Sequence, residues 1–145
     1  MSTQAFPILV VEDNADHQIL IGRALSLSFP QARLVFSDTA QQALAYLQSS
    51  LTQQAPLIRL VLLDIYLPRA ESGWQLLTTI RTDYPLLPVV AFSAQQTPDD
   101  VKRAYQLRVH SFLAKPLIVD EWSRYFETLR IYWMETVTLP PARYF

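Results

Sequence analysis

Five polar residues, each just beyond an apolar run, are the first candidates for chemistry in this sequence. In chain order they are Glu12, Asp13, Asp64, Ser93 and Lys115. A short uninterrupted apolar run between turn residues is typical of a strand buried on both faces, as in parallel sheets. Ligands of open α/β sheets bind beyond the carboxyl ends of the strands. We therefore expect these five side chains to meet at one edge of a sheet.

The three acids predict a magnesium site combined with phosphoryl transfer. Glu12, Asp13 and Asp64 would repel one another unless a cation neutralised them, and Mg²⁺ is commonly held by one or two carboxylates together with a phosphate. Asp64 could act as the nucleophile, because a carboxylate can accept a phosphoryl group. Catalysis of such a step is mainly positioning and charge neutralisation, for which Ser93 and Lys115 offer a hydroxyl and an ammonium group.

The elements that must position these residues alternate between strand and helix five times. We expect strands at 8–11, 32–36, 57–63, 87–92 and 111–114, a loop at 49–56 and a last helix at 119–134. Five alternations of this kind predict a parallel sheet with helices on both faces. The sequence therefore predicts a doubly wound α/β fold.

Capping residues mark the helix starts. Asn14 or Asp16 can cap the first helix, Thr39 the second, and Thr97 followed by Pro98 a later one. The apolar face of the first helix is predicted from residues at helical spacing, namely Ile19, Leu20, Ala24 and Leu27.

Composition argues against several other classes of protein. The 145 residues fit one domain, and the absence of cysteine removes disulfides, thiolate metal sites and cysteine nucleophiles. No apolar run approaches the ~20 residues of a membrane span and no signal peptide is recognisable, so we expect a soluble cytoplasmic protein. The 12 basic and 13 acidic residues are scattered, with a net charge of −1, so nucleic acid is not an expected partner.

Four motifs resemble the receiver domain of two-component response regulators, in order and in spacing. They are Ile-Leu-Val-Val-Glu-Asp-Asn at 8–14, Leu-Leu-Asp-Ile-Tyr-Leu-Pro at 62–68, Val-Val-Ala-Phe-Ser-Ala at 89–94 and Phe-Leu-Ala-Lys-Pro at 112–116. The resemblance covers about residues 6–134, with 135–145 as a tail, and implies a single receiver domain. It also implies a flavodoxin-like (βα)5 sheet of five parallel strands in the order 2-1-3-4-5.

The resemblance also implies a role for each site residue. Asp64 would be the phosphoacceptor, with Mg²⁺ bound by Glu12, Asp13, Asp64 and the backbone carbonyl of Tyr66. Ser93 and Lys115 would contact the phosphoryl group, and Ser93 and Phe112 would take the switch positions. The implied function is signalling rather than enzymatic turnover, with a sensor histidine kinase as the phosphoryl donor.

The segment at 133–140 resembles the ending of the stand-alone response regulators that partner cyanobacterial phytochromes. That similarity implies a phytochrome-type kinase and a homodimer. Tyr105, Trp122 and Tyr125 would form an apolar interface on the last two helices and the fifth strand. The alternative is that the tail, which includes Tyr144 and Phe145, folds back over this surface.

Three departures from the family pattern stand out. Gly73 lies nine residues after Asp64 instead of eight, so Arg69–Ser72 carry one extra residue, and this loop is expected to be reshaped around the metal site. Arg108 stands where glycine is usual, at a helix end that commonly needs a left-handed backbone. Phe112 has no hydroxyl, so switching there would rely on packing.

Two other functions compete with the phosphoacceptor. One is a pseudo-receiver that acts as a constitutive dimer or adaptor without phosphorylation. The other is a flavodoxin-like enzyme or flavin carrier, but Glu12 and Asp13 would repel the phosphate that such a site cradles after the first strand. His17 and His110 are expected at the surface, away from the carboxylates.

Overall fold

The computed structural model describes residues 5–52, 56–116 and 118–140. Its sheet has five parallel strands in the order β2-β1-β3-β4-β5. The strands are β1 (Phe6–Val11), β2 (Ala32–Ser37), β3 (Leu60–Asp64), β4 (Val89–Ser93) and β5 (Ser111–Ala114). The helices are α1 (Ala15–Ser28), α2 (Ala40–Leu51), α3 (Ala70–Asp83), α4 (Pro98–Gln106), α5 (Val119–Arg130) and the π-helix η1 (Ile131–Thr136). The predicted fold and the predicted strand order are confirmed.

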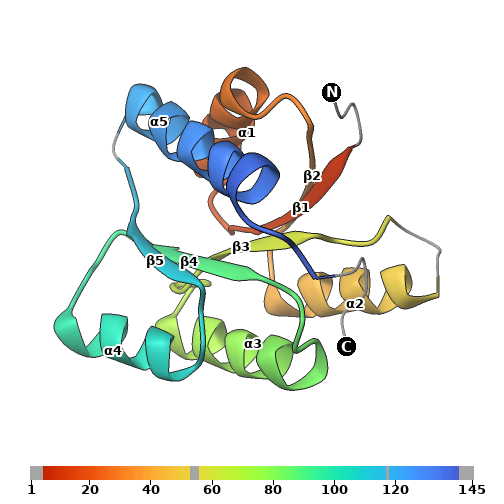
Figure 1. Ribbon diagram of the computed structural model, residues 1–145. Helices are drawn as coiled ribbons and strands as arrows, with labels where there is room; N and C mark the ends of the chain where they lie inside the picture. Colours follow the sequence, from red (N-terminus) through yellow and green to blue (C-terminus); the bar gives the residue numbers. More distant parts are fainter. Residues whose placement is uncertain (1–4, 53–55, 117, 141–145) are drawn as a thin grey trace.

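Helices cover both faces of the sheet (Figure 1). The helices α1 and α5 lie on one face, and α2, α3 and α4 lie on the other. Alternate residues of β1 follow this division, because Ile8 and Val10 pack with α1 and α5 whereas Leu9 and Val11 pack with the other three helices. Both faces of the central strands are therefore buried, which explains their continuous apolar sequences.

Strand register brings the functional ends of the strands to one edge. Val11 at the end of β1 pairs with Leu63, the residue before Asp64, and Asp64 itself pairs with Phe92. Ser93 pairs with Ala114, the residue before Lys115. The polar residues after four strands therefore gather at the carboxyl edge of the sheet.

Side-chain caps begin three of the helices. The side chain of Asn14 accepts a hydrogen bond from the N–H of His17, at 3.0 Å. Thr39 caps α2 in the same way, and Thr97 caps α4 with Pro98 at the first helical position. These caps agree with the prediction and fix how the chain leaves β1, β2 and β4.

The predicted loop at 49–56 is wrong over its first residues, because α2 continues to Leu51. The hydroxyls of Ser49 and Ser50 donate back to the carbonyls of Ala45 and Leu47, so both serines are accommodated within the helix. The predicted third strand also starts too early, since β3 begins at Leu60 rather than at residue 57. Pro7 of β1 accepts a hydrogen bond from the N–H of Arg59 but has no N–H to extend the pairing.

The apolar face predicted for α1 is wrong at two positions. Ile19 is 53% exposed and Leu27 is 76% exposed, whereas Ile21, Ala24 and Leu25 are buried. The sequence of α1 is apolar on more than one side, so spacing alone did not single out the side that packs on the sheet.

The predicted last helix changes character near its end. The α-helical hydrogen bonding of α5 stops at Arg130, and the wider π-helix η1 follows. Beyond it, Val137 and Leu139 pack against the core between the sheet and α1 and α5. The carbonyl of Pro140 accepts a hydrogen bond from the Arg59 guanidinium at 3.3 Å. This part of the tail folds back on the protein, while Tyr144 and Phe145 lie outside the described residues.

Two positions place unusual demands on the backbone, one through its φ angle and the other through a close approach. Arg108 has φ of 67°, the left-handed conformation expected for it from the sequence. At Gly73, an added Cβ would lie 1.9 Å from the carbonyl oxygen of Ile65, so only glycine fits beneath the segment that follows Asp64. Across the described residues, no helix is both long enough and apolar enough to cross a membrane.

Candidate functional site

Asp64 is the centre of the site at the carboxyl edge. It is the last residue of β3 and is only 4% exposed. Its Oδ1 accepts a hydrogen bond from the N–H of Tyr66 at 3.1 Å, and its Oδ2 accepts one from Lys115 Nζ at 3.0 Å. Both carboxylate oxygens therefore have a fixed partner at the end of the strand.

Glu12 shares the same lysine. Its carboxylate is fully buried after β1, and its Oε1 lies 2.5 Å from Lys115 Nζ. Its Oε2 accepts a hydrogen bond from the N–H of Asn14 at 3.2 Å, and its backbone carbonyl accepts one from the Gln18 amide at 2.6 Å. One ammonium group thus stands between two buried carboxylates.

The acids outnumber the cation at this edge. Glu12, Asp13 and Asp64 each offer a carboxylate oxygen, and these atoms lie within 4.8 Å of one another. Burial and the neighbouring Glu12 raise the pKa of Asp64 to about 6, although Lys115 acts in the opposite direction. Three hard oxygen donors, one of them on the exposed Asp13, fit a divalent cation that retains some of its water.

Ser93 ends β4 beside this cluster and is fully buried. Its Oγ accepts a hydrogen bond from the N–H of Gln95 at 3.1 Å. Its carbonyl accepts one from the N–H of Lys115 at 2.9 Å, which ties the ends of β4 and β5 together. The hydroxyl thus stabilises its own turn, as an isolated serine at a strand end commonly does.

The side chain of Tyr66 makes a contact that the sequence did not reveal. Its hydroxyl donates a hydrogen bond to Asp100 Oδ2 at 2.9 Å, which joins the loop after β3 to the first turn of α4. The bond to this carboxylate raises the pKa of Tyr66. The sequence analysis considered only the carbonyl of Tyr66, and no regular spacing pairs residues 34 positions apart.

His17 is a second residue that the sequence analysis missed. The prediction that it lies away from the carboxylates is wrong, because its Nδ1 is 3.3 Å from Glu12 Oε1. Burial, followed by the charge of Lys115, lowers the pKa of His17. The signal was its place in the first turn of a helix that begins just after the acids. His110 does lie elsewhere, with its Nδ1 accepting a hydrogen bond from the N–H of Val89 at 3.2 Å.

The residues predicted for switching and for dimerisation, apart from Ser93, lie on α4, β5 and α5. Phe112 is buried in the core under α2, α3 and α4. Tyr105 on α4 is 50% exposed, and Tyr125 on α5 is half-buried with its hydroxyl donating to the carbonyl of Ala114. Trp122, which was predicted at the dimer interface, is instead buried against Phe92 and Phe126, so its ring is not exposed for contact with a second copy.

The extra residue at Arg69–Ser72 does not lengthen an open loop. Ala70 already begins α3, and the N–H of Leu67 donates to the carbonyl of Arg69 at 3.2 Å. Gly73 then lets the first turn of α3 pass directly under Ile65. A tight turn, closed by backbone contacts, therefore carries the chain from Asp64 into the helix.

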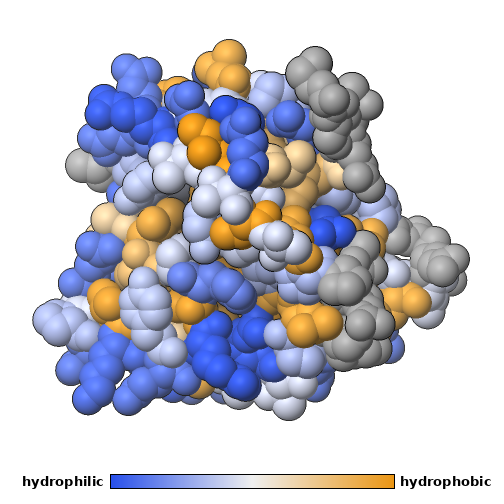
Figure 2. Space-filling model, viewed as in Figure 1, coloured by the Kyte–Doolittle hydropathy of each residue, from blue (hydrophilic) through white to orange (hydrophobic). Residues whose placement is uncertain are grey.

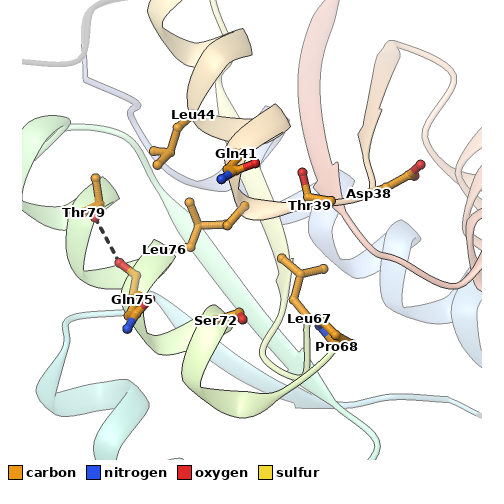
Figure 3. Close-up of a pocket in the computed structure, with 11 residues that line it drawn as sticks. Asp38, Thr39, Gln41, Leu44, Leu67, Pro68, Ser72, Gln75, Leu76 and Thr79 are labelled. Atoms are coloured by element: carbon orange, nitrogen blue, oxygen red, sulfur yellow. Dashed lines mark hydrogen bonds between the residues drawn. The ribbon is translucent and has the colours of Figure 1, made fainter.

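A cleft of about 440 Å³ lies beside this turn, between α2 and α3. Figure 3 shows Leu44 of α2, Leu76 of α3 and Leu67 of the turn around it, with Asp38 and Thr39 at one end. None of the five predicted site residues lines it. The cleft is therefore separate from the cluster of charges around Asp64.

Comparison with known proteins identifies the family. The family model described as the response regulator receiver domain matches residues 8–125. The response regulator Rcp1 of Synechocystis sp. is 31% identical over 148 residues, which span 98% of this chain and 100% of Rcp1. The probable methanogenesis regulatory protein FilR2 of Methanothrix harundinacea is 36% identical over 131 residues, which span 89% of this chain and 84% of FilR2.

Solved structures agree with this assignment. The Mn²⁺-bound form of Rcp1 has a TM-score of 0.79 and 30% identity, covering 93% of this chain and 99% of that one. The phosphorylated cyanobacterial phytochrome response regulator RcpA has a TM-score of 0.82 and 28% identity, covering 94% and 99%. Together with the site around Asp64, these matches show that the chain belongs to the response regulator receiver family of two-component signalling proteins and is similar to Rcp1 and RcpA.

Proposed function

We propose that this protein is a stand-alone response regulator that accepts a phosphoryl group on Asp64 from a sensor histidine kinase. The observation that carries the proposal is the Asp64 carboxylate, buried at a strand end with Lys115 Nζ 3.0 Å away. A carboxylate oxygen of Asp64 forms a bond to phosphorus as the bond from phosphorus to the kinase imidazole nitrogen breaks. The imidazole keeps the electron pair, and the product on Asp64 is an acyl phosphate.

Divalent cation binding belongs to the same proposal. Glu12, Asp13, Asp64 and the carbonyl of Tyr66 would hold Mg²⁺, for which the oxygen cluster within 4.8 Å and the Mn²⁺ bound to the similar Rcp1 are the support. When bound, the cation neutralises charge on the phosphoryl oxygens. Asp64 itself must be ionised to attack, and the cation favours that form.

Lys115 and Ser93 would receive the phosphoryl group. Lys115 Nζ already bridges Glu12 and Asp64, so a small movement of its side chain brings the ammonium to a phosphoryl oxygen. The Ser93 hydroxyl, which accepts a hydrogen bond from the N–H of Gln95, would donate to a second phosphoryl oxygen. Repacking around Phe112 would accompany this rearrangement.

The proposed partners follow from the relatives. RcpA is a phytochrome response regulator, and a third similar structure, RPA3017 with 25% identity and a TM-score of 0.83, acts in red light signalling. We therefore propose a cytoplasmic phytochrome-type histidine kinase as the donor. Output would be by protein–protein contact of one receiver unit spanning the chain, without nucleic acid or membrane contact.

The test of phosphoryl uptake is intact-protein mass after incubation with Mg²⁺ and acetyl phosphate. The expected result is one added phosphoryl group in the wild type and in Asp83→Asn, which alters an exposed acid at the end of α3. Asp64→Asn should show no addition. No addition to the wild type, under conditions that label an ordinary receiver, would favour the pseudo-receiver that acts as an adaptor.

A homodimer through α4, β5 and α5 is the second part of the proposal. Its support is the exposed Tyr105 and the half-buried Tyr125, whose ring packs edge-on against the buried Trp122. On the face viewed in Figure 2, apolar residues form small patches between polar ones. We expect Tyr105→Asp or Tyr125→Asp to weaken self-association in sedimentation experiments. Unchanged sedimentation of both variants would place the contact elsewhere.

A further inference from the structure

Tyr66 contacts both the end of β3 and the first turn of α4. Its backbone N–H donates to Asp64 Oδ1 at 3.1 Å, and its side-chain hydroxyl donates to Asp100 Oδ2 at 2.9 Å. A hydrogen bond to a carboxylate is stronger than one between neutral groups. One residue therefore links the phosphoacceptor carboxylate to the first turn of α4.

The helix that Tyr66 contacts is lightly attached. Its nine residues, Pro98–Gln106, bury only Ala104, and the lower edge of the molecule over α4 and α3 is mainly hydrophilic in Figure 2. A second polar contact of α4 joins the Arg103 guanidinium to α3, where it lies 4.9 Å from the centroid of the Trp74 ring. Few buried apolar contacts make an element easy to displace. The charge-assisted bond from Tyr66 therefore adds to the packing of Ala104 and the partly buried Val101 in positioning α4.

The position of Phe112 makes this bond more important. Phe112 is buried beneath α4 and has no hydroxyl, so it cannot form a hydrogen bond that changes with the state of Asp64. The Tyr66 hydroxyl, by contrast, forms a side-chain hydrogen bond that joins the loop after Asp64 to Asp100 of α4. Tyr105, five residues beyond Asp100, carries the displacement to the exposed surface of the same helix.

We propose that the Tyr66–Asp100 hydrogen bond positions the backbone of Tyr66 at the Asp64 site and couples occupation of that site to α4. Tyr66 and Asp100 are positioning residues, since neither side chain contacts the carboxylate of Asp64. A cation or phosphoryl group that moves the Tyr66 backbone pulls on Asp100 and shifts α4. Conversely, loss of the bond loosens the loop and weakens cation binding. The phosphoryl part rests on the proposed function, whereas the cation part requires only the acid cluster.

The experiment follows backbone amide NMR shifts of residues 101–106 during titration with Mg²⁺, and again after acetyl phosphate is added. Tyr66→Phe and Asp100→Ala each remove the bond, and we expect at least a ~3-fold smaller α4 response and a ~3–10-fold weaker Mg²⁺ affinity, as for other residues that orient metal ligands. Asp100→Asn keeps an acceptor oxygen but loses the charge, so both its α4 response and its Mg²⁺ affinity should fall between those of the wild type and of Asp100→Ala. Tyr46→Phe removes a tyrosine hydroxyl on α2 and should match the wild type.

The outcomes separate this proposal from phosphoryl uptake. If Tyr66→Phe and Asp100→Ala bind Mg²⁺ and shift α4 as the wild type does, the coupling is overturned. The same holds if α4 of the wild type responds to neither ligand. Failure of the wild type to gain a phosphoryl group in the mass measurement overturns the proposed function instead, and the Mg²⁺ titration still decides the coupling. Thermal unfolding of both variants controls for a general loss of fold.

Discussion

Each edge of the sheet buries a charged group, and the two edges differ in what balances the charge. At the carboxyl edge, Lys115 lies between Glu12 and Asp64, and the exposed Asp13 adds a third acid. At the amino edge, the Arg81 guanidinium at the end of α3 donates to backbone carbonyls of the loop that leads into β4. Among the described residues, no carboxylate pairs with Arg81.

This difference is why we propose the carboxyl edge as the functional one. Backbone carbonyls cannot leave or change their charge, so the partners of Arg81 are permanent and the residue stabilises one loop conformation. At the carboxyl edge, three carboxylates lie around one lysine, and a cation or a proton can relieve this excess of negative charge. Buried charge with fixed partners is structural, whereas buried charge that is incompletely balanced provides chemistry.

The largest predicted effect is at the amino edge. Arg81→Met removes the hydrogen bonds to the carbonyls of Pro85 and Leu87 and leaves the acceptor on the buried Leu87 without this partner. We expect a loss of about 2–4 kcal/mol in the free energy of unfolding, measured by urea denaturation. Arg124→Met, on the exposed side of α5, is the control and should change the free energy by less than about 0.5 kcal/mol.

Phosphoryl uptake by Arg81→Met, measured relative to its folded fraction, tests whether the amino edge has a part in the chemistry of the carboxyl edge. Arg81→Met should take up the group normally wherever it is folded, because no contact joins Arg81 to Asp64. A folded variant that binds Mg²⁺ normally but is not labelled would contradict the division between a structural and a functional edge.

A somewhat smaller effect is expected at the turn beneath Asp64. Gly73→Ala puts a methyl group 1.9 Å from the carbonyl oxygen of Ile65, so the turn or α3 must move. We expect a loss of about 1–3 kcal/mol, the cost of overpacking, together with slower phosphoryl uptake. Gly22→Ala is the control, because its new Cβ would lie 3.7 Å from the Phe36 ring, an ordinary contact. Equal stability of the two variants would contradict this prediction.

The smallest predicted effect is a gain rather than a loss in the free energy of unfolding, and it concerns Asp64. The folded-state pKa of Asp64 is about 6, above the ordinary value of 3.8, so folding takes up a proton between these values and the free energy of unfolding falls as pH rises through them. At pH 7.5 without divalent cations, the ionised Asp64 therefore costs stability. We expect Asp64→Asn to be more stable than the wild type by about 1–2 kcal/mol under those conditions.

The same variant tests the cause of the effect. The advantage of Asp64→Asn should shrink at pH 5, where the wild-type carboxyl is already protonated in the fold, and shrink again when Mg²⁺ is added at pH 7.5. An advantage that is independent of pH would show that packing, rather than the charge of Asp64, causes the difference.

The sequence predicted the carboxyl edge well because strand ends are governed by local rules. Apolar runs ending in Glu12, Asp64 and Ser93 define buried parallel strands, and the register of such strands brings their ends together. Caps at Asn14, Thr39 and Thr97 were predictable for the same reason, since each depends on residues within one turn.

Contacts set by tertiary packing were not predictable. The Tyr66–Asp100 bond depends on how α4 lies against the turn after β3, and the burial of Trp122 depends on how α5 is rotated. The exposed Ile19 and Leu27 show the same limit, because the periodicity of α1 does not state which apolar side packs on the sheet. His17 was missed because α1 begins close to Glu12, and its first turn directs the side chain of His17 back toward that acid.

The most direct test of the central claim is to locate the phosphoryl group. After labelling with acetyl phosphate and Mg²⁺, borohydride reduces an acyl phosphate of aspartate to homoserine, which peptide mass spectrometry can place in the sequence. Homoserine at position 64 alone is the predicted result. Homoserine at another acid, or none in a protein that has gained the mass of a phosphoryl group, would contradict Asp64 as the acceptor.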